Sequence, residues 1–385
     1  MIGWRRSLAL GLVLATAVVG TRPGSGAFGT ASVDDLVVPV VVDGDALVSL
    51  VPAPPGAPAL FAVGEQGGYR GTPDGASWVR AGDAPPEGRL VAAVDDGQTL
   101  LAGDHPPCAR GDPATVPLHR STDGGATWRP VAGVVGLRPL AVWSGAGVAL
   151  GAGCAGLAIS GDGGLTWERA PLTEANLDPT AFAPFAERDR IGGLLVGTGE
   201  GGTSQLWSVD LTDPDRPLLG DPLLEFWGLG ALAAQGETRS VGSAVGVAVS
   251  RDDGHTWTTS RDGLEIVTVD GDPRTEGLSE DELRRPFGIS AIALDPGDEE
   301  RLAAGTADGL FVSADGGATW SGVDGITGEV PVVVVLADGA VLAQTLAGVV
   351  RVGPVRSDAT PSASGPRGST SAPRFAPDIR QRERS

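Results

Sequence analysis

The segment SADGGATW at 313–320 decides the fold, because closely related segments recur along the chain. STDGGATW occupies 121–128, SGDGGLTW occupies 160–167 and SRDDGHTW occupies 250–257. A shortened copy, TPDGASW, occupies 72–78. The shared pattern is S-x-D-x-G-x-T-W, and so many copies of an eight-residue pattern do not arise by chance. The chain is therefore a repeat protein.

The spacing of the repeats predicts their architecture. The tryptophans that end the segments lie at 78, 128, 167, 257 and 320, so the gaps are 50, 39, 90 and 63 residues. A gap of 90 fits two units of 45, one of which has lost its motif, and 63 fits one unit with an insertion. Four short apolar runs recur around each segment, as in 289–296, 301–306, 309–317 and 318–323. Four antiparallel strands, A to D, at this period are typical of a propeller blade.

The repeated segment suits the turn between strands C and D. Its Asp carboxylate can accept hydrogen bonds from turn N–H groups, and the glycine at its fifth position permits a positive φ. Its hydroxyls can close the turn, and its Trp can enter the packing between strands. The residues predicted to have this structural role are Asp74, Trp78, Ser121, Asp123, Gly125, Thr127, Trp128, Ser160, Asp162, Gly164, Trp167, Ser250, Asp252, Gly254, Trp257, Ser313, Asp315, Gly317 and Trp320.

The blade count follows from the repeats. Six units end near residues 83, 133, 172, 221, 263 and 324, and a seventh begins at Val330 with runs for only three strands. The apolar run Asp35–Val42 has no unit of its own, so it would supply the missing strand D and remove two open sheet edges. The sequence therefore predicts an all-β, seven-bladed propeller over residues 34–356, closed by an N-terminal strand.

The two ends of the chain differ from the repeat region. Arg5 and Arg6 precede the apolar run Leu8–Val19, and small residues follow at 25–27. This pattern predicts a cleaved signal peptide over 1–27 rather than an uncleaved anchor, because the run is too short to span a bilayer. The paired Arg residues also allow twin-arginine export, but the residues around them match that signal weakly, so the general secretory route is favoured. The Ser-, Pro- and Arg-rich stretch 357–385 predicts a disordered tail. We expect a secreted or cell-envelope protein with no transmembrane segment in the mature chain.

Composition excludes several classes of function. The chain has 60 Gly and 30 Pro, which argues against a helical protein. It has 48 acidic residues against 28 basic ones, all of them Arg, for a net charge of -20. Such a surface repels phosphate backbones, so we do not expect nucleic acid as a partner. We expect a soluble monomer. The only two cysteines, Cys108 and Cys154, predict a disulfide in an exported chain.

The repeated segments are Asp boxes, and the chain resembles the Asp-box (BNR repeat) β-propeller superfamily over residues 34–356. That superfamily includes sialidases, glucan-cleaving glycosidases, sortilin-type receptors and photosystem II assembly factors. The resemblance implies the fold but no single function, because one propeller hosts unrelated activities. In the family the box is a structural turn on the face opposite the catalytic one, which implies that the box Asp residues are not catalytic.

Enzymatic functions fit poorly. Sialidases use a Tyr nucleophile, and the single Tyr69 falls in an expected strand C, a packing position. The Arg-Ile-Pro signature of that family is absent near the N-terminus. Glucan-cleaving relatives use a carboxylate pair and are typically built from two propellers, whereas this chain has repeats for one. The three His residues lack metal-ligand spacing, so no catalytic residue, metal or cofactor is predicted.

The preferred interpretation is a non-catalytic binding or scaffold propeller outside the cytoplasm that recognises a protein or glycan; a glycoside hydrolase of the Asp-box type is the alternative. Loop length varies most in the B–C and D–A loops, which share one face, and variable loops on a constant scaffold carry recognition. Phe226 and Trp227 would stack on a ligand there or pack beneath the insertion 264–287. The candidate binding residues on this face are His105, Arg110, Phe226, Trp227, Glu276, Arg284 and Arg285.

Overall fold

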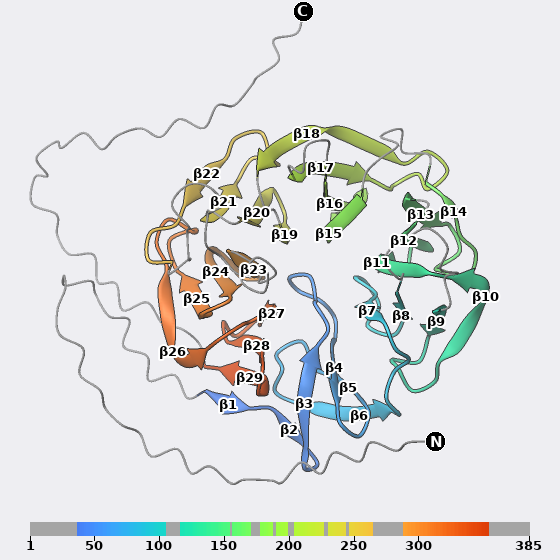
Figure 1. Ribbon diagram of the computed structural model, residues 1–385, viewed down its shortest axis with the longest axis horizontal. Coiled ribbons are helices and arrows are strands. Elements are labelled where there is room, and N and C mark those ends of the chain that lie inside the picture. Colours follow the sequence, from blue (N-terminus) through green and yellow to red (C-terminus); the bar gives the residue numbers. More distant parts are fainter. Residues whose placement is uncertain are drawn as a thin grey trace, which may run out of the picture. The chain divides into compact units, whose positions relative to one another are not determined.

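The computed structural model describes residues 37–104, 116–154, 156–170, 178–187, 190–198, 204–226, 230–243, 246–264 and 288–353, with backbone only at 178–180, 186–187, 198 and 226. Every regular element within these ranges is a β-strand. The strands form seven antiparallel sheets arranged as a ring (Figure 1). The prediction of an all-β, seven-bladed propeller is therefore confirmed. The predicted signal peptide at 1–27 and the predicted tail at 357–385 lie outside the described residues.

Each blade takes its strands in chain order, so hairpins make the whole sheet. Blade 1 consists of β3(Asp45–Leu50), β4(Leu60–Gly64), β5(Gly68–Gly71) and β6(Trp78–Gly82), and blade 2 consists of β7(Arg89–Ala92), β8(Leu100–Gly103), β9(Pro117–Ser121) and β10(Arg129–Val135). Blade 3 consists of β11(Leu137–Trp143), β12(Val148–Gly153), β13(Gly156–Ser160) and β14(Glu168–Arg169). Blade 4 consists of β15(Asp178–Glu187), β16(Arg190–Thr198), β17(Ser204–Asp210) and β18(Leu218–Phe226). Blade 5 consists of β19(Ala231–Gln235), β20(Thr238–Ser243), β21(Gly246–Ser250) and β22(Thr258–Ser260). Blade 6 consists of β23(Ile289–Asp295), β24(Asp298–Thr306), β25(Gly309–Ser313) and β26(Ser321–Thr327). Blade 7 contains β27(Val332–Val335), β28(Val341–Thr345) and β29(Gly348–Val352). Blades 4 and 7 carry no Asp box in their sequence.

The N-terminal strand closes the ring, but it does so in two pieces. β1(Val38–Pro39) pairs with β29 of blade 7, with Val38 opposite Arg351. β2(Val41–Val42) then pairs with β3 of blade 1 and becomes a fifth strand of that sheet. Val40 lies between the two pieces and donates its N–H to the carbonyl of Val349 at 2.9 Å. The segment therefore joins the first blade to the last, whereas the sequence predicted a single strand D for blade 7.

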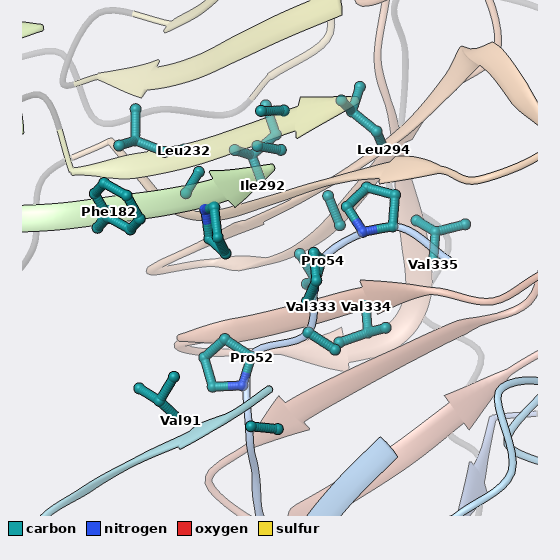
Figure 2. Close-up of a pocket in the computed structure, with 18 of the residues that line it drawn as sticks. Pro52, Pro54, Val91, Phe182, Leu232, Ile292, Leu294, Val333, Val334 and Val335 are labelled. Atoms are coloured by element: carbon teal, nitrogen blue, oxygen red, sulfur yellow. The ribbon is translucent and has the colours of Figure 1, made fainter. Parts of the chain in front are cut away.

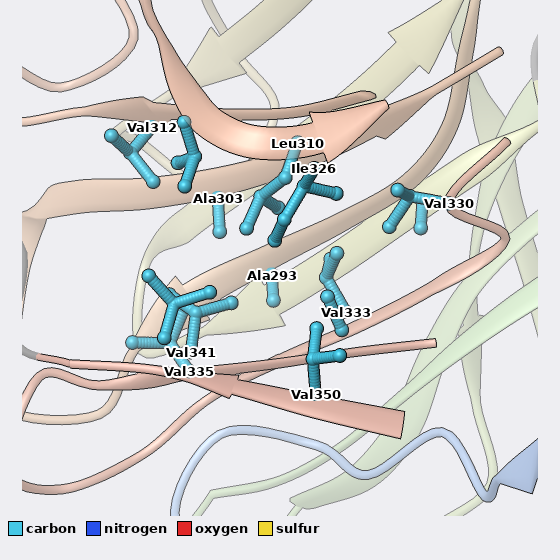
Figure 3. Close-up of a cluster of buried hydrophobic side chains, with 14 residues drawn as sticks. Ala293, Ala303, Leu310, Val312, Ile326, Val330, Val333, Val335, Val341 and Val350 are labelled. Carbon is cyan, nitrogen blue, oxygen red and sulfur yellow. The ribbon is translucent and has the colours of Figure 1, made fainter. Parts of the chain in front are cut away.

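Apolar side chains between neighbouring blades make the core. Between blades 6 and 7, small and branched residues from both sheets interlock, including Ala303, Val330 and Val341, which are almost fully buried (Figure 3). Similar clusters fill the other interfaces. Each sheet buries both faces, so its inner strands read as continuous apolar runs rather than as alternating patterns. In the part of the chain that the structure describes, no helix has the length and hydropathy needed to cross a bilayer.

The closing strand generates a first prediction. Val40→Pro removes the N–H that reaches Val349 and should destabilise the ring by about 1–3 kcal/mol, because an unpaired buried carbonyl remains. Val40→Thr keeps that N–H and serves as the matched control. Urea unfolding monitored by tryptophan fluorescence measures both variants. If the proline variant unfolds at the same urea concentration as the control, the strand does not hold the ring closed.

Candidate functional site: the central cavity and the two faces of the ring

The Asp boxes form closed hydrogen-bonded turns between strands C and D. In the third box, Asp162 accepts the hydroxyl of Ser160 at 2.8 Å, the N–H of Thr166 at 2.8 Å and the hydroxyl of Thr166 at 2.6 Å. Gly164 donates its N–H to the Ser160 hydroxyl and has a φ of 91°, which favours glycine. The boxes around Asp123, Asp252 and Asp315 repeat these contacts. Both oxygens of each carboxylate are therefore occupied by the turn.

A second set of bonds ties each box to the neighbouring turn of its own blade. The fourth residue of the box donates its N–H to a carbonyl in the A–B turn, as Gly163 does to Gly147 at 2.6 Å. Gly124, Asp253 and Gly316 make the equivalent bonds to Gln98, Glu237 and Glu300. The A–B and C–D turns thus share one face, which we call the box face. The B–C and D–A loops belong to the opposite face, which we call the loop face.

The box tryptophans pack against the preceding blade. Trp320 is 4 % exposed and lies in the cluster between blades 5 and 6. Trp167 packs against the cluster between blades 2 and 3, and Trp257 packs against the one between blades 4 and 5. The indole of Trp320 donates to the carbonyl of Gly317 at 3.1 Å, and Trp78, Trp167 and Trp257 repeat that bond. One side chain thus couples the box turn to the packing between blades.

The box carboxylates are held ionised. The pKa of Asp123 is lowered to about 2, chiefly by a hydrogen bond from the Thr127 hydroxyl. The pKa of Asp252 is also lowered to about 2, chiefly by a hydrogen bond from the Thr256 hydroxyl. Partial burial opposes the shift at Asp162, but hydrogen bonds from Thr166 and Ser160 outweigh it and its pKa is about 2. A carboxylate with a low pKa and no free oxygen is poorly suited to donate a proton, so these residues fit a structural role.

The fourth box departs from the pattern because it carries Asp253 where the others have glycine. Asp253 has a φ of 58°, a conformation that L residues rarely adopt. Its carboxylate pairs with Arg239, whose side chain is 1 % exposed and lies over the ring of Phe185 at 4.8 Å. Arg190 adds a second ion pair to Asp253 at 3.8 Å. This network joins blades 4 and 5, and it accounts for a charged residue at a glycine position.

Tyr69 is a packing residue. It lies in β5, is 3 % exposed, and donates its hydroxyl to Asp45 Oδ2 at 2.7 Å. That bond is the main cause that raises the pKa of Tyr69, and it also lowers the pKa of Asp45. Asp45 accepts two further N–H groups, from Glu65 and Gln66. A buried phenol with a raised pKa is a poor nucleophile, so the pair closes a turn of blade 1 rather than forming a sialidase-type site.

The candidate binding residues of the loop face lie outside the described side chains. They are His105, Arg110, Trp227, Glu276, Arg284 and Arg285, together with Phe226, whose backbone belongs to β18 but whose side chain is not described. Cys154 follows β12, in the B–C turn of blade 3. Cys108 falls outside the described residues, so the pairing of the two cysteines stays a prediction, as does binding at this face. Among the described residues, no group of His, Cys, Asp or Glu side chains could hold a metal ion.

A cavity of about 100 Å³ lies at the centre of the ring, and inner strands from six blades line it (Figure 2). The lining is apolar, with Val91 from blade 2, Phe182 from blade 4, Leu232 from blade 5 and Val334 from blade 7. Arg89 is the one charged residue among the described residues that line it. The cavity can therefore accommodate a small apolar group beside a single cation.

A proline-rich loop of blade 1 crosses the end of the cavity at the box face. The loop joins β3 to β4, and its residues Pro52–Pro55 are part of the cavity lining (Figure 2). A Cβ on Gly56 would lie 3.9 Å from the Cβ of Pro296, in the A–B turn of blade 6. The loop therefore reaches past blade 7, and it lies at the middle of the ring in Figure 1. Because proline fixes φ and removes an N–H donor, such a loop can enter an apolar site at low cost.

Arg89 lies at the other end of the cavity. It is the first residue of the inner strand β7, and the A–B turns follow the last residues of the inner strands. Arg89 therefore lies at the strand end opposite the A–B turns. Its side chain is half-buried and makes no ion pair with any described residue. Burial is the main cause that lowers the pKa of Arg89; repulsion from Arg138 adds to it, and Asp104 opposes it. Arg138 occupies the matching position of the next inner strand, β11, which contacts β7.

Sequence reasoning missed this cavity. Its residues come from segments far apart in the sequence, from Pro52 to Val335, so no local pattern marks them. Two signals were present in hindsight: the stretch VPAPPGAPA at 51–59 is unusually long for an A–B turn, and two successive units begin their inner strand near an arginine, Arg89 and Arg138.

No protein-family model and no curated protein sequence matches this chain. Solved structures show the same fold at low identity. The propeller "YCF48 bound to D1 peptide" is 16% identical, with a TM-score of 0.51, over 85% of this chain and 97% of that one. U3-55K is 13% identical, with a TM-score of 0.48, over 83% of this chain and 98% of that one.

The GH74 enzyme of Niastella koreensis is 14% identical, with a TM-score of 0.38. The match covers 77% of this chain and 62% of that enzyme, so this chain spans less than two thirds of its length. At these identities the likeness extends to the fold alone.

The tryptophan packing generates a second prediction. Trp320→Ala should lower the free energy of unfolding by about 3–5 kcal/mol, because it leaves a cavity between blades 5 and 6. Trp320→Phe should cost less, since it keeps an aromatic ring and loses only the indole hydrogen bond. The exposed Ala318→Ser of the same box is the control. Equal thermal stability of Trp320→Ala and the control would contradict a structural role for the box.

The box carboxylates generate a third prediction, for pH dependence. Their folded-state pKa of about 2 lies below the ordinary value of 3.8, so their contribution to stability is complete above pH 4. It should be lost as the pH falls from about 4 to about 2, since the unfolded state then binds more protons. Urea unfolding at several pH values should show this decline.

A variant with Asn at 123, 162 and 252 tests the assignment of that decline. It should be less stable than the wild type at pH 6, and its stability should change less below pH 4. An equally steep decline in this variant would show that other carboxylates cause the acid sensitivity.

Proposed function

We propose that the chain is an exported Asp-box propeller that binds a protein or glycan on its loop face and does not catalyse a reaction. The observation that carries this proposal is the contrast between the two faces. On the box face, hydrogen bonds within and between turns occupy the polar groups of the repeats. The connections between blades differ in length along the chain: 28 residues separate β22 from β23, whereas one residue separates β10 from β11. Recognition on propeller scaffolds uses such variable loops.

Membership of the Asp-box superfamily is part of this proposal. Its support is the repeated S-x-D-x-G-x-T-W pattern together with the recurring hydrogen bonds of the box. A propeller of the same fold, YCF48, has been solved with a D1 peptide bound, so the fold can hold a peptide in that protein. For export, the support is the N-terminal sequence pattern at 1–27.

A glycosidase function has less support. Tyr69 is buried, and the box carboxylates are engaged in turns. A hydrolase needs two carboxyl groups facing one substrate with separated pKa values. The general acid of such a pair requires a raised pKa, whereas the pKa of each box Asp is lowered. Binding without turnover is therefore the function that the described residues favour.

The fourth prediction tests the binding face. Purified full-length protein is screened against peptide and glycan arrays, and any hit is measured by titration calorimetry. Deletion of 274–285 should weaken that binding at least about tenfold, because it removes charged residues that the proposal assigns to the binding face. A variant with Ala at Glu168 and Arg169 changes two exposed residues of β14 beside a box and is the control.

Two outcomes would contradict the proposal. One is unchanged affinity in the deletion variant together with loss of affinity in the control. The other is turnover of sialosides or glucans by the purified protein, which would show that the propeller is an enzyme.

A further inference from the structure

Beyond recognition on the loop face, we propose that the central cavity is a binding site for a small monocarboxylic acid, with the apolar part in the cavity and the carboxylate on Arg89. This site uses none of the residues assigned to the loop face. A negative result for this site would therefore leave the proposed function on the loop face untouched, and the reverse also holds.

The size and lining of the cavity define the apolar part of the ligand. A buried apolar cavity of about 150 Å³ holds a benzene ring. The cavity here measures about 100 Å³ and is lined by valine, leucine, phenylalanine and proline side chains. It therefore fits a compact group of about four to six carbon atoms. Sugars fit less well, because Arg89 is the only lining side chain that can form hydrogen bonds with their many hydroxyl groups.

Arg89 defines the charge of the ligand. Arg89 lines the cavity, is half-buried, and forms no ion pair with the described residues. A partly buried cation with no counter-charge among the described residues is unfavourable, because it has lost water and gained no ion pair with them. A carboxylate restores that balance with two parallel N–H···O bonds, a geometry that the guanidinium fork matches. A single half-buried guanidinium fork beside apolar side chains favours a monoanion over phosphate or a diacid.

The position of Arg89 gives the ligand its orientation. The proline-rich loop crosses the cavity at the box face, and Arg89 lies at the opposite end of the inner strands. The apolar group would point toward Pro52 and Pro54, with the carboxylate directed toward the loop face. Arg138, at the matching position of blade 3, adds positive charge near the same end and lowers the pKa of Arg89.

The setting makes this site selective. The protein carries a net charge of -20, so most of its surface repels carboxylates. Arg89, at one end of the cavity, is a local exception. An acid without an apolar group gains little there, and an apolar molecule without a carboxylate leaves Arg89 unpaired.

The fifth prediction tests this site with isovalerate and benzoate, by titration calorimetry and thermal shift in low-salt buffer free of other carboxylates. Both acids should bind saturably, with dissociation constants of about 0.1–10 mM, as expected for ligands of so few atoms. Both should raise the melting temperature, because they bind only the folded state. Isovaleramide and benzamide are neutral isosteres, and acetate lacks the apolar group. All three should bind at least about tenfold more weakly, since a charged hydrogen bond or the apolar contact is lost.

Three variants assign the binding to the cavity. Arg89→Met keeps an apolar stem but removes the charge, and it should weaken the binding of benzoate at least about tenfold. Leu232→Trp narrows the cavity at the opposite wall and should weaken both acids while Arg89 is retained. Arg129→Met removes the same charge from an exposed position on β10 and should bind as the wild type does.

The proposal is overturned if neither acid binds the wild type at roughly 10 mM, a concentration well above the expected constants. It is also overturned if the amides bind as tightly as the acids, or if Arg89→Met and Arg129→Met bind benzoate equally. The comparison of acids with amides needs no variant, so it decides the matter even if Arg89→Met does not fold.

Discussion

The hydrogen bonds between the Asp carboxylate and the Thr of the four full boxes are the interaction on which the rest of the structure depends. In the third box they join Asp162 to the N–H and the hydroxyl of Thr166 and so fix a tight turn between strands C and D. The turn places Trp167 against the preceding blade, where it joins the apolar cluster. Repeated around the ring, one local motif sets both the hairpin and its contact with the next sheet. In a propeller without long-range crossovers, these contacts carry the cohesion of the fold.

Closure of the ring creates the central cavity. The inner strands carry Ala, Val and Leu because they pack on both faces, and they leave a narrow apolar space around the axis. Blade 1 enters that space with a loop of proline and small residues. The same architecture brings Arg89 to one end of the space, where no described carboxylate pairs with it. A structural constraint, seven sheets around one axis, therefore produces a site that no single blade contains.

Local features of this fold could be predicted from the sequence, whereas features that depend on the assembled ring could not. The Asp boxes marked the C–D turns because their hydrogen bonds connect residues within four positions of one another. Counting strands also predicted that an N-terminal strand closes the ring. The division of that strand between Val38–Pro39 on blade 7 and Val41–Val42 on blade 1 depends on the geometry of two sheets. Arg89 was missed for the same reason, since the cavity joins residues of blades distant in sequence. The loop-face candidates, such as His105 and Arg284, remain predictions.

The most direct test of the box as the central structural unit is amide hydrogen exchange at its threonines. Thr127, Thr166, Thr256 and Thr319 are exposed, yet each donates its backbone N–H to the box carboxylate. By this account their exchange at pH 6 is slowed at least about 100-fold relative to an unstructured peptide, because a stable turn must open first. Exchange of these four amides at the rate of an unstructured peptide would contradict the account.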